Sequence, residues 1–253
     1  MRVLAVARNT FREAVRDKVL YVLLLFAATA IFGSKALGWI SIGQDIKIVK
    51  DISLAAVSVF GVLIAIFVGT NLVYKEIDKR TIYTILCRPM HRWEFILGKY
   101  IGLAGLLALV TAVMAAVASV YVVILGGNID LIFFQAVLLI YWQLLLITAL
   151  AVLLSALTSP ILGAIIVFST YVVGHATTIF TDLPPHFDGT VSKHILQAIY
   201  YIIPNLSNFD IRAEAANGVP VASGYVLWAL AYGTVYTTVL LIIASLAFQD
   251  KDV

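Results

Sequence analysis

Long apolar runs with few charged positions dominate the pattern of this chain. An α-helix needs about 20 mostly apolar residues to cross the hydrocarbon core of a bilayer, and runs of that length recur along the sequence. Turn-forming residues separate neighbouring runs, at Gly126-Gly127-Asn128 and at Ser159-Pro160. The pattern therefore predicts a single all-α integral membrane domain over residues 1–253. Its six transmembrane helices are predicted at residues 19–40, 52–74, 98–125, 129–157, 161–180 and 224–248.

The first segment, residues 1–18, has a different, amphipathic pattern. On a helical wheel most of its apolar side chains fall within about 120° of arc, and its arginines lie on the other side. The apolar face comprises Val3, Leu4, Ala7, Phe11, Ala14 and Val15, the polar face includes Arg8, Arg12 and Arg16, and only Ala5 and Val6 depart from this division. A basic amphipathic helix suits the membrane surface, although such a face can also pack on another protein domain. We predict an interfacial helix here.

Lysine and arginine residues predict the orientation of the chain. Of the 17 in the sequence, 12 belong to the N-terminal segment, to the loop after the second run or to the C-terminus, and five lie on the other side. Since cytoplasmic loops carry the excess of these residues, both termini and the 75–97 loop are predicted to be cytoplasmic. The 181–223 loop is then external. Its short apolar stretch 194–203 is too short to span and is predicted to lie in the outer interface or to re-enter the membrane.

Composition supports this assignment. Hydrophobic residues make up 62% of the chain and charged residues 12%, about half the charged fraction of a typical soluble domain. The single cysteine, Cys87, allows no disulfide within the chain, and the four histidines show no spacing typical of metal ligands. We therefore expect no bound metal.

Catalytic chemistry and ion coupling find little support inside the predicted spans. His175 is the one titratable candidate that the prediction places deep in a span, and helix packing is the simpler role for it. Ion-driven carriers and intramembrane enzymes usually need intramembrane acids, bases or nucleophiles. No GxxxxGK[ST] phosphate loop occurs either, so we expect no ATPase activity from this chain and no catalytic residues. A separate ATPase subunit is the economical source of energy. Gly98 and Gly102, at GxxxG spacing, are candidates for close helix packing.

The loop after the second run has a pattern typical of a short docking helix. Thr81 can cap its start, Ile85 and Leu86 belong to one apolar face, and Pro89 disfavours helix at the preceding residue, Arg88. A helix this short needs a partner surface, either the lipid interface or a soluble subunit. A positively charged loop with no further role is the simpler alternative.

Three stretches resemble permease subunits of ABC-2-type transporters, and most closely the branch associated with maturation of multi-copper enzymes. They are ARNTFREAVRDKVLY from Ala7, EIDKRTIYTILCRPMHRWEFILGKYIG from Glu76 and YIIPNLSNFDIR from Tyr201. The matching positions in the second stretch are Glu76, Thr81, Pro89, Arg92, Gly98 and Lys99. Many family members have Gly before the Thr, where this chain has Arg80.

The resemblance implies a multi-pass subunit of the prokaryotic cytoplasmic (inner) membrane that works as a pair of six-span halves, either a homodimer or two paralogues. A partner ATPase would bind ATP and Mg, and this chain would hold no cofactor. Residues 1–18 would be an elbow helix, 75–97 the coupling loop and 181–223 an external cap. The predicted ATPase contact comprises Tyr83, Ile85, Leu86, Arg88 and Arg92.

Three functions stay open at this point. The first is an ATP-driven transporter, expected to be an exporter, and the second is a membrane partner through which an ATPase does mechanical or regulatory work without transport. The third, a passive channel, ranks last because polar residues such as Thr111, Gln143 and Ser155 are sparse along the spans. Nothing in the composition suggests nucleic-acid binding, and nothing identifies a substrate.

Overall fold

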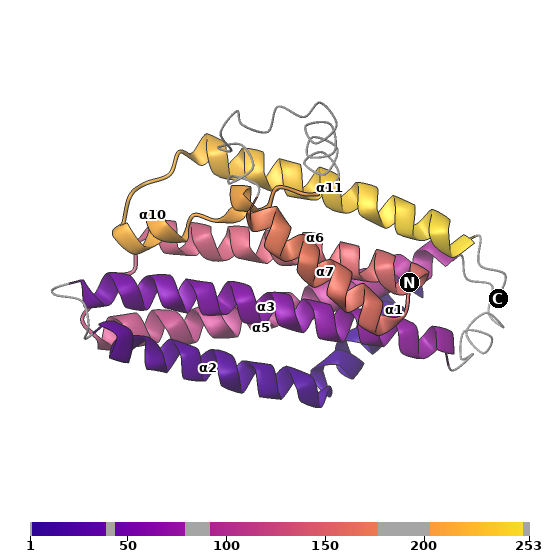
Figure 1. Cartoon of the computed structure of the whole chain (residues 1–253), viewed down its shortest axis with the longest axis horizontal. Coiled ribbons are helices and arrows are strands. Elements are labelled where there is room, and N and C mark those ends of the chain that lie inside the picture. Colours follow the sequence, from indigo (N-terminus) through magenta and orange to yellow (C-terminus); the bar gives the residue numbers. More distant parts are fainter. Residues whose placement is uncertain (1, 39–43, 79–91, 177–202, 250–253) are drawn as a thin grey trace, which may run out of the picture.

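Helices make up the described part of the chain. The computed structural model describes residues 2–38, 44–78, 92–176 and 203–249. The helices are α1 (Arg2–Val15), α2 (Lys18–Gly38), α3 (Asp45–Asp78), α5 (Arg92–Ile124), α6 (Leu131–Leu157), α7 (Pro160–His175), the 3₁₀ helix η1 (Leu206–Phe209), α10 (Arg212–Asn217) and α11 (Ser223–Gln249). Figure 1 shows the long helices side by side in one elongated bundle. The all-α prediction is confirmed for these residues.

Five of these helices are long and apolar enough to cross a membrane: α2, α3 up to Thr70, α5 from Trp93, α6 and α11. The sixth apolar helix, α7, has 16 residues and is therefore about 24 Å long, less than the roughly 30 Å of a hydrocarbon core. Its predicted end at residue 180 lies outside the described residues, as does all but the last residue of the predicted interfacial stretch 194–203. The described residues thus support five candidate spans and one shorter apolar helix.

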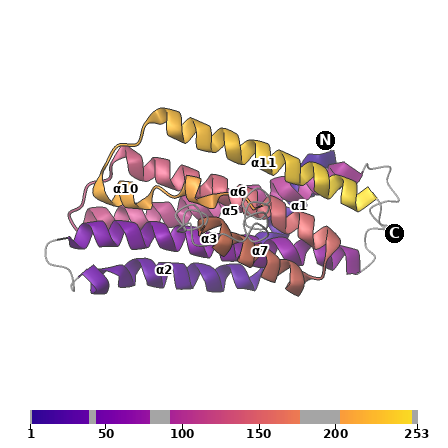
Figure 2. The ribbon, with the colours of Figure 1, turned by 45° about the horizontal axis from the view of Figure 1, so that its top comes forward.

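The centre of the bundle is formed by α3 and α6. About two thirds of the most apolar 18 residues of α3 are buried within the chain, compared with about a quarter of the corresponding residues of α2 and α11. The backbones of α3 and α6 approach closely, since a Cβ built on Gly61 would lie 2.7 Å from Leu144 Cδ1. The two views in Figures 1 and 2 place α2 and α11 on opposite sides of this central layer. The outer faces of α2 and α11 are therefore the ones left for lipid or for another subunit.

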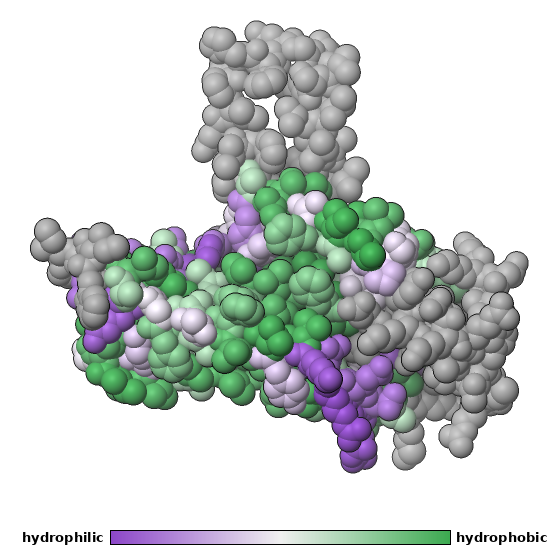
Figure 3. Space-filling view, turned by 60° about the horizontal axis from the view of Figure 1, so that its bottom comes forward, coloured by the Kyte–Doolittle hydropathy of each residue, from purple (hydrophilic) through white to green (hydrophobic). Residues whose placement is uncertain are grey.

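The bundle has two distinct ends. One end, called the α1 end below, holds α1, the start of α5 and the end of α11 (Figure 1). The opposite α10 end holds the end of α2, the start of α3, the α5–α6 turn and α10 (Figures 1 and 2). In the space-filling view, hydrophobic residues cover the middle of the visible face and hydrophilic residues gather toward its ends (Figure 3). This distribution suits a protein whose middle lies in a bilayer.

One predicted boundary was wrong in an informative way. Helix α3 begins at Asp45, not at residue 52, so Lys47 and Lys50 lie in its first turns and not in a loop. The carbonyl of Gln44 accepts hydrogen bonds from the N–H groups of Lys47 and Ile48, which starts the helix. Lys50 is buried, with its Nζ 3.2 Å from Asp130 Oδ2. A charge that hydropathy assigns to a loop is thus accommodated in the helix by an ion pair.

Candidate functional site: the two ends of the bundle

The predicted coupling segment falls between two long helices. Thr81, Tyr83, Ile85, Leu86, Arg88 and Pro89 lie outside the described residues, so the predicted ATPase contact stays a prediction. Glu76 lies in the last turns of α3 and Arg92 is the first residue of α5, although their side chains also lie outside the description. The segment between them is therefore anchored at both ends in helices that run through the bundle.

Helix α1 packs on the first turns of α5 at two glycines. A Cβ built on Gly98 would lie 2.7 Å from Val6 Cβ, and one built on Gly102 would lie 2.6 Å from the carbonyl oxygen of Ala7. Real Cβ atoms do not approach other atoms so closely, which means that these two positions need glycine for α1 to lie where it does. The small-residue spacing thus serves a close helix contact, as such spacings often do in membranes.

The buried side of α1 differs from the predicted apolar face. Ala7, Thr10 and Ala14 are buried, Val6 and Phe11 are half-buried, and the predicted face member Leu4 is 74% exposed. Arg8, Arg12 and Arg16 are exposed. Much of the amphipathic face is therefore used against α5 of the same chain. Leu4 and the arginines are the part of α1 that remains available to a membrane surface or a partner.

Helix α5 also contacts the end of α11 at this level. Lys99 is 1% exposed, and its Nζ lies 5.7 Å from the ring centroid of Phe95. Phe95 in turn stacks on Phe248 of α11, with 5.9 Å between ring centroids. A buried cation is costly unless it is compensated, and the face of the Phe95 ring helps to stabilise the charge of Lys99. The first turns of α5 are thus held between α1 and α11, directly after the predicted coupling segment.

At the α10 end, residues 203–218 fold back into the bundle. Leu206 and Phe209 of η1 are fully buried. A Cβ on Gly174 of α7 would lie 2.8 Å from Leu206 Cγ, and one on Gly233 of α11 would lie 2.9 Å from Phe209 Cζ. The N–H of Asn205 donates to the Tyr232 hydroxyl, 3.0 Å away. These contacts seat the segment between α7 and α11.

A carboxylate–guanidinium pair joins η1 to α10. Arg212 Nε and Nη2 donate to the two carboxylate oxygens of Asp210 at 2.7 and 2.6 Å, and the Arg212 backbone N–H donates to Asp210 Oδ1 at 3.2 Å. Burial alone would raise the pKa of Asp210, but the hydrogen bonds and positive charge of Arg212 outweigh it and lower that pKa. The hydrogen bond to Asp210 likewise raises the pKa of Arg212.

His175 was expected deep in the fifth span, but it is the last residue of α7. Its ring lies 4.6 Å from that of Tyr171, and its Nδ1 is 3.2 Å from the Tyr171 carbonyl oxygen. The backbone oxygen of His175 accepts a hydrogen bond from Ser207 Oγ, 3.1 Å away. These contacts give His175 a packing role at the joint between α7 and η1.

Comparison with known families decides the class of this protein. Residues 4–253 match the family described as ABC-2 family transporter protein. The chain belongs to the ABC-2 transporter family. The match covers nearly the whole chain and includes both ends of the bundle described above. A search of curated proteins finds no match.

As a member of the ABC-2 family, the chain is a multi-pass membrane component of a transporter. Its described residues hold no group of three or more His, Cys, Asp or Glu side chains that could bind a metal ion. The assignment to the branch associated with multi-copper enzyme maturation stays a prediction.

Sequence reasoning missed three features of this ABC-2 chain. They are the buried contact of Thr10 with Gly102, the Lys99–Phe95 contact and the burial of the 203–218 segment. The first had a signal, because Thr10 lies three residues after Ala7 and so shares its helix face. The second was also local, because Lys99 lies four residues after Phe95 on the same face of α5. The burial of the 203–218 segment depends on contacts with α7 and α11, which no local pattern marks.

Proposed function

We propose that this chain is the permease subunit of an ATP-driven exporter, coupled through residues 76–97 to a separate ATPase subunit. Family membership supports a permease. The observation that carries the coupling is the position of the first turns of α5, between α1 and the end of α11. A displacement of the loop would act directly on Arg92, where α5 begins, and rigid helices transmit such a displacement.

The permease would work as one of a pair of such chains, the second being an identical copy or a paralogue. The outer helices α2 and α11 support this, because large apolar side chains such as Leu25 and Leu227 are about two-thirds exposed within the single chain. The pair would lie in a prokaryotic inner membrane with the α1 end in the cytoplasm. Residues 203–218 would then cap the outer end.

A double substitution tests the coupling. Leu86→Asp with Arg88→Glu removes an apolar contact and inverts a charge in the predicted docking helix, outside the predicted spans. We expect normal expression and insertion but loss of ATPase co-purification, or ATP turnover without transport. Val219→Asp makes the same apolar-to-acidic change at an exposed position of the α10 end and should leave the ATPase bound. Normal binding and transport by the double variant would show that the loop is not the coupling element.

The second candidate is a membrane partner that uses ATP for mechanical work without moving a substrate. ATP-dependent movement of a substrate into or out of liposomes separates it from the exporter. A passive channel is disfavoured by the hydroxyls inside α6: Thr148 Oγ1 donates to the Leu144 carbonyl and Ser155 Oγ to the Val152 carbonyl, both at 2.7 Å. These groups are satisfied within their own helix and are buried, so they line no open polar path.

A further inference from the structure

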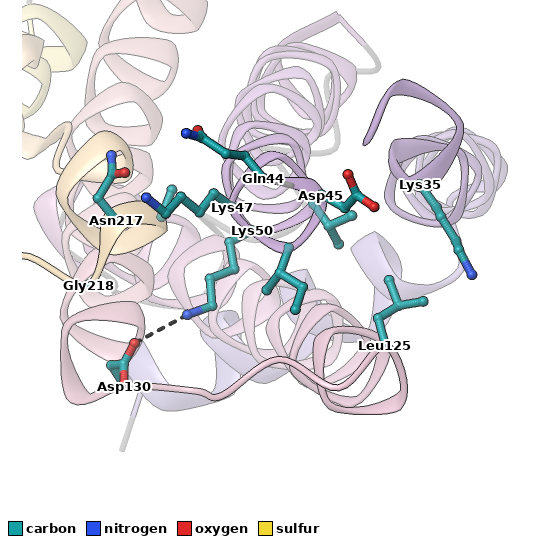
Figure 4. Close-up of a pocket in the computed structure, with 12 residues that line it drawn as sticks. Lys35, Gln44, Asp45, Lys47, Lys50, Leu125, Asp130, Asn217 and Gly218 are labelled. Atoms are coloured by element: carbon teal, nitrogen blue, oxygen red, sulfur yellow. Dashed lines mark hydrogen bonds and ion pairs between the residues drawn. The ribbon is translucent and has the colours of Figure 1, made fainter. Parts of the chain in front are cut away.

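A pocket of about 540 Å³ lies at the α10 end of the bundle. Its walls come from the end of α2, the start of α3, the α5–α6 turn and the end of α10 (Figure 4). The lining residues are Lys35, Gln44, Asp45, Ile46, Lys47, Val49, Lys50, Leu125, Asp130, Ala216, Asn217 and Gly218. None of the interactions described above for coupling or for the 203–218 segment uses this space.

The charges of the pocket favour an anion. Three lysines and two aspartates line it, which leaves an excess of one positive charge. Lys50 is paired with Asp130 at 3.2 Å, so Asp130 is neutralised. Lys35 and Lys47 are exposed and make no ion pair within the described part of the chain. In Figure 4 the ammonium group of Lys47 points toward the Asn217 side of the pocket, and Lys35 lies at the opposite side, beyond Asp45.

The start of α3 adds hydrogen-bond donors to these charges. The first N–H groups of a helix have no partner within it, and the positive end of the helix dipole lies there. Gln44 precedes this start, and Asp45 and Ile46 are the first two residues of α3, all three in the wall of the pocket. Free N–H groups beside unpaired lysines are a combination that suits phosphate oxygens.

An apolar wall adjoins the pocket on the side of α2 and α5. Phe32 of α2, which lies one turn before the pocket residue Lys35, and Ile124 of α5, which precedes the pocket residue Leu125, are both more than half exposed. The Tyr121 hydroxyl donates to the Phe32 carbonyl oxygen at 2.9 Å, which ties the two helices together here. A ligand in the pocket therefore has an apolar surface beside it that runs toward the middle of the bundle.

We propose that this pocket binds the phosphate group of an anionic phospholipid, with the acyl chains along the exposed side chains of α2 and α5. The apolar wall favours a lipid over a free phosphate ion, since a free ion gains nothing from it. The excess of lysine favours an anionic headgroup over a zwitterionic one. This binding site is independent of the proposed coupling to an ATPase.

The test measures lipid binding to the full chain purified in detergent, by native mass spectrometry with phosphatidylglycerol and with phosphatidylcholine. The wild type should bind phosphatidylglycerol more tightly. Lys35→Gln with Lys47→Gln should weaken that binding about 25-fold, because each lysine near an anionic headgroup contributes about fivefold. Lys18→Gln, at the other end of α2, is the matched control and should bind as the wild type does.

A third variant is expected to bind the lipid more tightly, so its test does not depend on a loss of binding. Asp45→Asn removes a negative charge from the pocket and should tighten phosphatidylglycerol binding about fivefold. Titration with inorganic phosphate separates the two sources of the anion: lysine-dependent phosphate binding without any lipid preference would assign the site to a free anion. Equal binding of both lipids together with no lysine-dependent phosphate binding would overturn the proposal, as would weaker phosphatidylglycerol binding by Asp45→Asn.

Discussion

At the scale of single residues, Asp210 and Arg212 show how a short polar contact can set local structure. The residue between them, Ile211, is buried and supplies no side-chain cap for α10. The Asp210 carboxylate accepts the Arg212 backbone N–H in its place, while the guanidinium binds both oxygens. Such bidentate pairs are stronger than single ion pairs. The pair therefore fixes the path of the chain between η1 and α10.

Replacement of Asp210 by Asn tests this pair through its dependence on pH. A carboxyl whose pKa is lowered in the folded state stabilises that state at pH values above its unfolded pKa, about 3.9, and loses the effect as pH falls through the folded pKa. Both partners are about one-quarter exposed, so we expect Asp210→Asn to cost only about 1 kcal/mol at neutral pH. The difference should vanish in acid. Thermal unfolding of both proteins across this pH range measures it.

Glu13→Gln is the control for this prediction, because Glu13 is exposed and its side chain makes no ion pair within the described residues. It should leave stability unchanged at every pH. A difference between wild type and Asp210→Asn that grows toward acid pH would contradict the assignment of the lowered pKa.

At the scale of elements, the contact of α1 with α5 has a direct test. Gly102→Ala places a Cβ 2.6 Å from the Ala7 carbonyl oxygen and 2.7 Å from Thr10 Cβ, so α1 must move. We expect a loss of about 1–3 kcal/mol in stability from this overpacking. Gly33→Ala in α2 is the matched control, because its Cβ meets nothing within 4 Å and alanine is the better helix former. Equal thermal stability of Gly102→Ala and Gly33→Ala would show that α1 is not held at this site.

The same scale shows what the sequence could predict. Hydropathy placed the bounds of α6 and α11 to within two residues, because a bilayer demands continuous apolar length, but it started α5 six residues late. The start of α3 was missed because Lys50 is stabilised by Asp130, 80 positions later. The burial of Phe209 was missed because its contact with Gly233 lies in another helix. Contacts between segments that are distant in sequence produce no hydrophobic periodicity in the local sequence, so such a pattern cannot predict them.

The candidate site was also only partly predictable from the sequence. The GxxxG spacing of Gly98 and Gly102 is local and visible in the sequence, and the structure places both glycines against α1. The side of α1 that contacts these glycines was only partly predictable. A helical wheel separates apolar from polar side chains, but it does not show whether an apolar face contacts lipid or packs on protein. Thr10 illustrates this, since it is polar and yet fully buried.

At the scale of the whole molecule, the ends of the bundle differ in charge as well as in structure. The N-terminal segment 1–18 and residues 75–99 hold 11 of the 17 lysines and arginines, counting Arg2, Arg8, Arg12, Arg16 and Lys18 in the first and Lys75, Lys79, Arg80, Arg88, Arg92 and Lys99 in the second. The described parts of both segments lie at the α1 end (Figure 1). The described parts of two segments that are far apart in sequence are thus at the same end, as an orientation inferred from their lysines and arginines requires.

This orientation predicts that Cys87 faces the cytoplasm. Because Cys87 is the only thiol in the chain, a membrane-impermeant maleimide reports on one position without further engineering. We expect no labelling in intact cells and labelling once the membrane is permeabilised. An introduced cysteine at Val219, on the exposed α10 end, is the matched control in a Cys87→Ser background and should react in intact cells. Labelling of Cys87 in intact cells, with Val219→Cys protected, would reverse the orientation and with it the side on which an ATPase must bind.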